Sequence, residues 1–164
     1  MQEAALISGS KPETYDALVE QAGALLAGEH DLVANAANLV SLVYHSLPDL
    51  NWVGLYLFDG RELVVGPFQG QPACVRIAFG KGVCGTAAAT LTTQVVEDVN
   101  AFPGHIACDA RSRSEIVIPL VDRTGALVGV LDVDSPLLGR FDAVDRDGME
   151  RLGASFLASL DDSG

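Results

Sequence analysis

In Asn51-Trp-Val-Gly-Leu-Tyr-Leu-Phe-Asp-Gly-Arg-Glu-Leu-Val-Val65 the residue pattern changes to a period of two, and this change determines the fold. Trp52–Phe58 is typical of a strand, Asp59-Gly60 of a hairpin turn, and Glu62–Val65 of the returning strand. Successive side chains of a strand point to opposite faces. One face of the first strand therefore carries Trp52, Gly54, Tyr56 and Phe58, and the other carries Val53, Leu55 and Leu57.

Two helices are expected before this hairpin. Pro12 suits the first turn of a helix that ends near Gly28. Asp31 can cap a second helix, which Pro48 stops. The apolar stripe of the second helix has steps of 4, 3, 4 and 4, through Leu32, Ala36, Leu39, Val43 and Leu47. Residues 1–11 are expected to form a flexible N-terminal tail.

Further strands and two more helices are expected after the hairpin. The strands are Cys74–Phe79, Gln94–Val96, Glu115–Val121 and Leu127–Asp134, the helices are Val83–Thr90 and one capped by Asp142, and residues 98–114 form a long loop. Hairpin connections and helices at both ends of the chain predict an α+β fold. We expect one domain over residues 12–160, with an antiparallel sheet of about six strands and helices packed on its faces.

Composition and charge exclude several classes of function. The 164 residues carry a net charge of −12, which disfavours binding to nucleic acid or to an anionic membrane surface. Hydrophobic residues make up 49% of the chain and charged residues 20%, as in ordinary folded proteins. The sequence shows neither a membrane-spanning apolar run nor the basic start of a signal peptide, so a cytoplasmic location is expected.

The chain contains three cysteines, Cys74, Cys84 and Cys108. An odd number cannot form a complete disulfide framework, and in a reducing cytosol any disulfide would be transient and catalytic. Together with His105 the cysteines would number four metal ligands, but their spacing is too loose to favour a zinc site. No metal is therefore expected.

Cys108 lies in a polar segment with Arg111 and Arg113, whose positive charges would lower the pKa of its thiol, while Asp109 would oppose this. A reactive thiolate is therefore the favoured interpretation of Cys108. Cys84 lies among small residues, and a buried and inert thiol is an equal alternative for it.

Three carboxyl groups form a second candidate cluster. Asp132 and Asp134 share one face of their strand, and Glu115 opens the strand before it. A pocket that binds an ammonium group or donates a proton is the functional interpretation, and a solvated strand end is the alternative. Trp52 and Tyr56 are either core residues or the wall of a cage for a cation and a polarisable sulfur. The glycines at 80, 82 and 85 match no nucleotide-binding motif.

Seven motifs follow one another in an order that carries a family resemblance. They are Asn51-Trp-Val-Gly-Leu-Tyr56, Gly66-Pro-Phe-Gln-Gly70, Pro72-Ala-Cys-Val-Arg76, Gly80-Lys-Gly-Val-Cys-Gly85, Ala101-Phe-Pro-Gly-His-Ile-Ala-Cys-Asp109, Ser112-Arg-Ser-Glu-Ile-Val117 and Gly129-Val-Leu-Asp-Val-Asp-Ser-Pro136. Over residues 12–160 the chain resembles the free methionine-R-sulfoxide reductases, which are stand-alone GAF domains. The resemblance implies that Cys108 is the nucleophile, Cys74 the main resolving thiol and Cys84 an auxiliary thiol. It also implies that the pocket is lined by Trp52, Tyr56, Glu115, Asp132 and Asp134.

The activity that the resemblance implies is reduction of free L-methionine-(R)-sulfoxide to methionine. The reaction would pass through a Cys108 sulfenic acid and an intramolecular disulfide that thioredoxin recycles, with no cofactor. A homodimer is also expected from the resemblance. Which carboxyl group is the proton donor, and whether Cys74 or Cys84 resolves the sulfenic acid, both stay open. The alternatives are a GAF sensor that binds a small molecule without catalysis and a general thiol peroxidase or disulfide oxidoreductase, although the compact cysteine motif of the latter two is missing.

Overall fold

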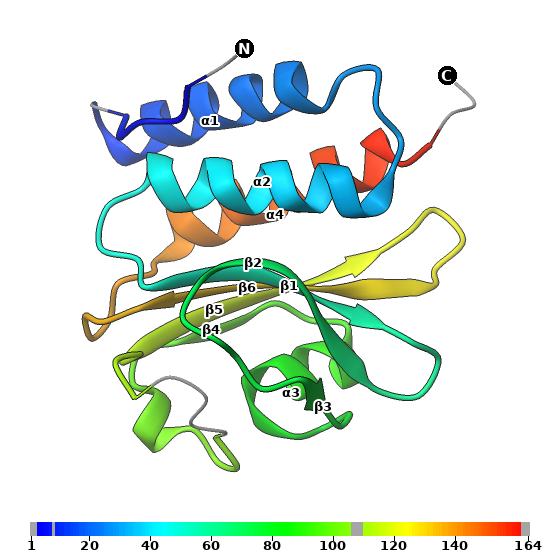
Figure 1. Ribbon diagram of the computed structural model, residues 1–164. Helices are drawn as coiled ribbons and strands as arrows, with labels where there is room; N and C mark the ends of the chain where they lie inside the picture. The colour runs from blue at the N-terminus through cyan, green and yellow to red at the C-terminus, as the bar shows by residue number, and fades with distance from the viewer. Residues whose placement is uncertain (1–2, 8, 106–109, 162–164) are drawn as a thin grey trace.

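The computed structural model describes residues 3–7, 9–105 and 110–161. Within them six strands form one antiparallel sheet in the order β3-β2-β1-β6-β5-β4. Three helices cover one face of the sheet and α3 lies against the other (Figure 1). The elements are α1 (Lys11–Leu26), α2 (Leu32–Ser46), β1 (Trp52–Phe58), β2 (Leu63–Gly70), β3 (Arg76–Ile77), α3 (Gly82–Thr90), β4 (Gln94–Val96), the 3-10 turn η1 (Val99–Ala101), β5 (Ser114–Val121), β6 (Leu127–Ser135) and α4 (Ala143–Ser159). The predicted α+β class, with its antiparallel sheet and helices on both faces, is confirmed.

The two faces of β1 belong to two separate apolar clusters, as the alternation of its residues predicted. Val53 and Leu55 are completely buried against α1, α2 and α4. Trp52 and Tyr56 pack on the opposite face with residues of α3. The three-helix face is the larger core, and the α3 face holds the polar groups described below.

Side chains cap three of the helices. The Asp31 carboxylate accepts from the Ala34 N–H at the start of α2, and Asp142 forms a capping box with Asp145 at the start of α4, so both predicted caps are confirmed. Helix α1 begins at Lys11 with Pro12 in its first turn, as predicted, and the Ser10 side chain accepts from the Glu13 N–H.

Other boundaries differ from expectation in ways that have local causes. Strand β3 is shorter than the expected Cys74–Phe79, since only Arg76 and Ile77 pair with β2. Part of the segment assigned to the N-terminal tail contacts the domain. The Ile7 N–H donates to the Ser46 carbonyl at 3.2 Å, and the side chains of Ala4 and Ile7 pack against the three-helix core. In the described part of the chain, no helix is long and apolar enough to cross a membrane.

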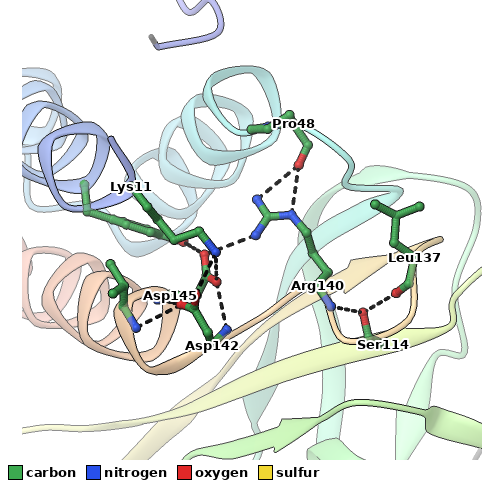
Figure 2. Close-up of polar contacts among 9 residues, drawn as sticks. Lys11, Pro48, Ser114, Leu137, Arg140, Asp142 and Asp145 are labelled. Carbon is green, nitrogen blue, oxygen red and sulfur yellow. Dashed lines mark hydrogen bonds and ion pairs between the residues drawn. The ribbon is translucent and has the colours of Figure 1, made fainter. Parts of the chain in front are cut away.

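A buried ion-pair network joins the helices to the sheet (Figure 2). The Asp145 carboxylate accepts from Lys11 Nζ at 2.8 Å, from Arg140 Nη1 at 3.2 Å and from the Tyr15 hydroxyl at 2.6 Å. Arg140 also donates through Nε and Nη2 to the Pro48 carbonyl, which follows α2. The Arg140 N–H donates to the Ser114 hydroxyl, which in turn donates to a backbone carbonyl. The network therefore holds the first residue of β5 in place.

Candidate functional site

One pocket on the α3 face is lined by three carboxyl groups of the sheet. Its lining includes Trp52, Tyr56, Cys84, Glu115, Asp132 and Asp134. The cavity measures about 50 Å³, which is room for a few water molecules. Five of these residues were predicted to line a substrate pocket, and the structure brings all five together around Cys84.

The register of three neighbouring strands explains this convergence. Glu115 of β5 lies opposite Asp134 of β6, which lies opposite Trp52 of β1. Asp132 lies opposite Gly54 on the same face. Opposite residues of paired antiparallel strands have Cβ atoms only about 5 Å apart. Three carboxyl groups and an aromatic ring therefore lie side by side on a rigid part of the sheet.

Burial of the carboxyl groups changes their acidity. Glu115 is 7% exposed and Asp132 is 4% exposed. Burial, followed by the charge of Asp132, raises the pKa of Glu115 well above its usual value. Burial, followed by the charge of Asp134, does the same to the pKa of Asp132. Both groups consequently keep a proton to a higher pH than an exposed carboxyl group does.

Asp132 is also incompletely satisfied. Among the residues that the structure describes, its Oδ1 is a buried oxygen without a hydrogen-bond partner. A buried acceptor in this condition costs about 1–3 kcal/mol. Because Asp132 lines the pocket, this oxygen suits a donor from a bound molecule.

Cys84 lies in the first turn of α3, with its Sγ 3.9 Å from Glu115 Oε2. The thiol is free and buried. Burial, followed by the charges of Asp132 and Glu115, raises its pKa well above the usual value. A thiol in this state is a poor nucleophile, because the attacking species is the thiolate.

An aromatic stack forms the wall of the pocket on β1. The rings of Trp52 and Tyr56 are stacked with centroids 5.7 Å apart, and the ring of Phe68 on β2 stacks with Trp52 at 5.2 Å. The indole N–H donates to the Gln71 carbonyl at 3.0 Å. A Cβ atom at Gly54 would lie 2.4 Å from Cη2 of Trp52, so only glycine lets the ring lie flat on the strand. Phe68 was missed in the sequence, because a register shift between Gly54 and Tyr56 brings it opposite Gly54 and the hairpin turn gives no sign of that shift.

The N-terminal end of α3 forms another part of the lining. Lys81, Gly82 and Val83 all border the cavity. The first-turn N–H groups of a helix have no partner within the helix and carry a partial positive charge. No side chain of the described residues caps this end of α3. The sequence showed the helix but gave no sign that its end would face the carboxyl groups.

The structure describes two of the three cysteines. Cys74, just before β3, is disulfide-bonded. Cys108 lies outside the described residues, together with Asp109. His105 and Ser112 border the segment that contains Cys108, and both line the pocket. The assigned roles of the cysteines, and the influence of Arg111 and Arg113 on Cys108, stay predictions.

The fold and this site define the class of protein. Residues 13–159 match the model of the GAF domain family, so the chain belongs to that family.

Relatives identify the group within it. The chain is 51% identical to the free methionine-R-sulfoxide reductase of Escherichia coli, over 88% of this chain and 87% of that protein. It is 44% identical to the Saccharomyces cerevisiae enzyme of the same name, over 87% and 83% of the two chains. The Neisseria meningitidis enzyme, solved in complex with its substrate, superposes with a TM-score of 0.92 at 42% identity and covers 98% of this chain and 96% of its own. The chain is a member of the free methionine-R-sulfoxide reductases, a family of oxidoreductases.

Proposed function

We propose that the protein reduces free L-methionine-(R)-sulfoxide to methionine by thiol chemistry and is recycled by thioredoxin. The observation that carries this proposal is the buried set of three carboxyl groups beside the Trp52–Tyr56 stack. A free amino acid brings an ammonium group, and a sulfoxide brings a polarisable sulfur. Carboxyl groups suit the first and aromatic rings the second.

Recognition of the ammonium group explains the choice of a free amino acid. The unpartnered Oδ1 of Asp132 accepts from an N–H⁺ that a peptide-bound residue lacks. The α-carboxylate of the same molecule fits the N-terminal end of α3, beside Lys81. The ammonium group and the carboxylate of the substrate thus bind on opposite sides of one pocket.

The proposed reaction transfers the sulfoxide oxygen to a cysteine. The Cys108 thiolate attacks the sulfoxide sulfur while a protonated carboxyl group, Glu115 or one of the aspartates, protonates the oxygen. The attack forms a bond between the sulfurs of Cys108 and the substrate. The hydroxyl group then moves from the substrate sulfur to the Cys108 sulfur as this bond and the sulfur–oxygen bond of the substrate break, so that methionine leaves and Cys108 becomes a sulfenic acid. The raised pKa values of Glu115 and Asp132 support the role of proton donor. The raised pKa of Cys84 argues against it as the attacking thiol.

Recycling requires a resolving thiol in this chain and two electrons from an external dithiol. The sulfenic acid condenses with the Cys74 thiol to form a disulfide and water, and a dithiol of thioredoxin reduces that disulfide by exchange. Cys74 is a disulfide-forming residue in this structure, which supports its role as the main resolving thiol. Cys84 remains as an auxiliary thiol in the substrate pocket.

A coupled assay tests the proposal. NADPH consumption is followed with thioredoxin and its reductase, with free methionine-R-sulfoxide, the free S form or the N-acetylated R form as substrate. We expect turnover of the free R form alone, and its loss in Cys108→Ser. Equal turnover of the N-acetylated form would refute ammonium recognition, and unchanged activity of Cys108→Ser would refute the nucleophile.

The resolving thiol is tested separately. Cys74→Ser should release one equivalent of methionine per chain in a single turnover and then recycle slowly. Cys84→Ser is the matched control, with multiple turnover largely retained. The opposite result would make Cys84 the resolving thiol.

A further inference from the structure

Cys84, Glu115 and Asp132 form a set of metal-type ligands that the proposed reaction does not use together. One ligand atom from each lies within 4.8 Å of the others, and all three side chains are buried. We propose that these residues form a binding site for a thiophilic divalent cation of the zinc class. The Cys84 thiol gives up its proton to become the thiolate ligand.

The donor set and its spacing fit such a cation. A Zn–S bond of about 2.3 Å and a Zn–O bond of about 2.0 Å place tetrahedral ligand atoms about 3.5 Å apart. The Sγ of Cys84 and Oε2 of Glu115 are 3.9 Å apart already. Small side-chain rotations therefore close the site. One thiolate and two carboxylates favour zinc over calcium or magnesium, which prefer oxygen ligands alone.

An independent observation points to a ligand at the same place. Asp132 is 4% exposed, and its Oδ1 has no hydrogen-bond partner among the described residues. Native proteins satisfy nearly all buried polar atoms. A cation bonded to this oxygen would remove the cost of leaving it unpaired.

The backbone holds the three ligands in fixed positions. Cys84 comes from the first turn of α3, and Glu115 and Asp132 come from the paired strands β5 and β6. The start of β5 is held by Ser114 and Arg140 (Figure 2). Three protein ligands leave a fourth position open for water, on the pocket side.

Metal binding has a consequence for catalysis, which rests on the proposed function. The cation occupies the place assigned to the substrate ammonium group and uses the oxygens assigned to it. Zinc should therefore compete with free methionine-R-sulfoxide. It should raise KM with little change in kcat.

Cobalt binding tests the site without any need for activity. The full chain with Cys74→Ser and Cys108→Ser keeps Cys84 as its one thiol, so a sulfur-to-cobalt charge-transfer band reports that residue alone. We expect the band with Co²⁺, its displacement by Zn²⁺, and its loss in Cys84→Ser. Glu115→Gln and Asp132→Asn should each weaken Co²⁺ binding by about tenfold or more. Asp16→Asn, on the outer surface of α1, is the matched control.

Two results would overturn the site. One is absence of the band in a chain that thermal unfolding shows to be folded. The other is unchanged Co²⁺ affinity in both Glu115→Gln and Asp132→Asn. A chain without reductase activity that still binds Co²⁺ through these ligands would refute only the proposed function. A chain that reduces the sulfoxide but binds no Co²⁺ would refute only the metal site.

Discussion

Two buried aspartates of this protein have opposite surroundings. Asp145, at the junction of α1 and α4, is completely buried and accepts from Lys11, Arg140 and the Tyr15 hydroxyl (Figure 2). Asp132, on the other side of the sheet, lies beside two other carboxyl groups and a thiol, with an unpartnered oxygen. Two aspartates with similar burial therefore have different roles. Asp145 holds the fold together, and Asp132 is available to a bound molecule.

The comparison teaches how to separate structure from function in buried acids. A charge that is surrounded by donors is compensated within the fold, and removing it leaves those donors unpaired. A carboxyl group that lacks donors destabilises the fold, and its compensation has to come from a bound molecule. The two clusters should therefore respond in opposite ways to the same kind of substitution.

The largest expected effect is on catalysis. Glu115→Gln removes a proton donor but keeps the shape of the side chain, so kcat/KM for free methionine-R-sulfoxide should fall by about 10²–10⁴-fold. Steady-state kinetics measure this, with the exposed Glu20→Gln as the control. A loss below tenfold would assign the proton to one of the aspartates.

Asp145→Asn should have the largest effect on stability. Breaking a buried ion pair costs about 3–5 kcal/mol, because Lys11 and Arg140 lose a charged partner. Urea unfolding measures the change. The matched control is Asp16→Asn, which breaks an exposed pair with Arg151 and should stay within about 1 kcal/mol. Equal losses of unfolding free energy in Asp145→Asn and Asp16→Asn would contradict the difference between the buried and the exposed ion pair.

Arg140→Lys tests the geometry of the same network. The charge stays, but the planar fork that reaches both Asp145 and the Pro48 carbonyl is lost. We expect a loss of about 1.5–3 kcal/mol of unfolding free energy. Arg146→Lys, in an exposed pair within α4, should change it by less than about 0.5 kcal/mol.

The smallest effects are on the pH dependence of stability, and they have opposite signs. Asp142 beside Lys11 is exposed; the small loss of solvation there raises its pKa, but hydrogen bonds from the Asp145 N–H and Lys11 outweigh this and lower its pKa from 3.8 to about 2. Its contribution to stability is therefore present above pH 3.8 and is lost as the pH falls to about 2. Asp142→Asn should remove that part of the acid loss.

Asp132 should have the opposite effect on the pH dependence of stability. Its pKa is raised above 3.8 in the folded protein by burial and by Asp134, so the native state loses stability as the pH rises from that value. Asp132→Asn should flatten the decline above pH 3.8. Unfolding curves at several pH values measure both slopes, and a steeper decline in Asp132→Asn would reverse the argument.

Much of the site could be predicted because its residues are close together along two hairpins. Alternation placed Asp132 and Asp134 on one face, and Trp52 and Tyr56 on one face of β1. Pairing of β5 with β6 then brings Glu115 opposite Asp134. Local patterns specify which face of the sheet each side chain occupies, whereas the register shifts between Gly54 and Tyr56 and between Leu120 and Val121 leave no sign in the sequence.

Contacts between distant segments could not be predicted in this way. Lys11 and Asp145 are 134 positions apart, and no local pattern pairs them. The approach of the α3 end to the carboxyl groups likewise depends on how a helix packs across the sheet. For the N-terminal segment, the contact of Ile7 with Ser46 requires α2 to be in place. Tertiary packing decides these features, and composition carries no sign of them.

Gly54 has a consequence for how substrate preference in such a protein can change. The missing Cβ atom at this position leaves room for the Trp52 ring, which stacks with both Tyr56 and Phe68. The width of the pocket is thus set by a residue that has no side chain to touch a ligand. Mutational searches for altered selectivity should therefore include Gly54. A single methyl group at this position would displace the indole of Trp52 and change the shape of the pocket opening.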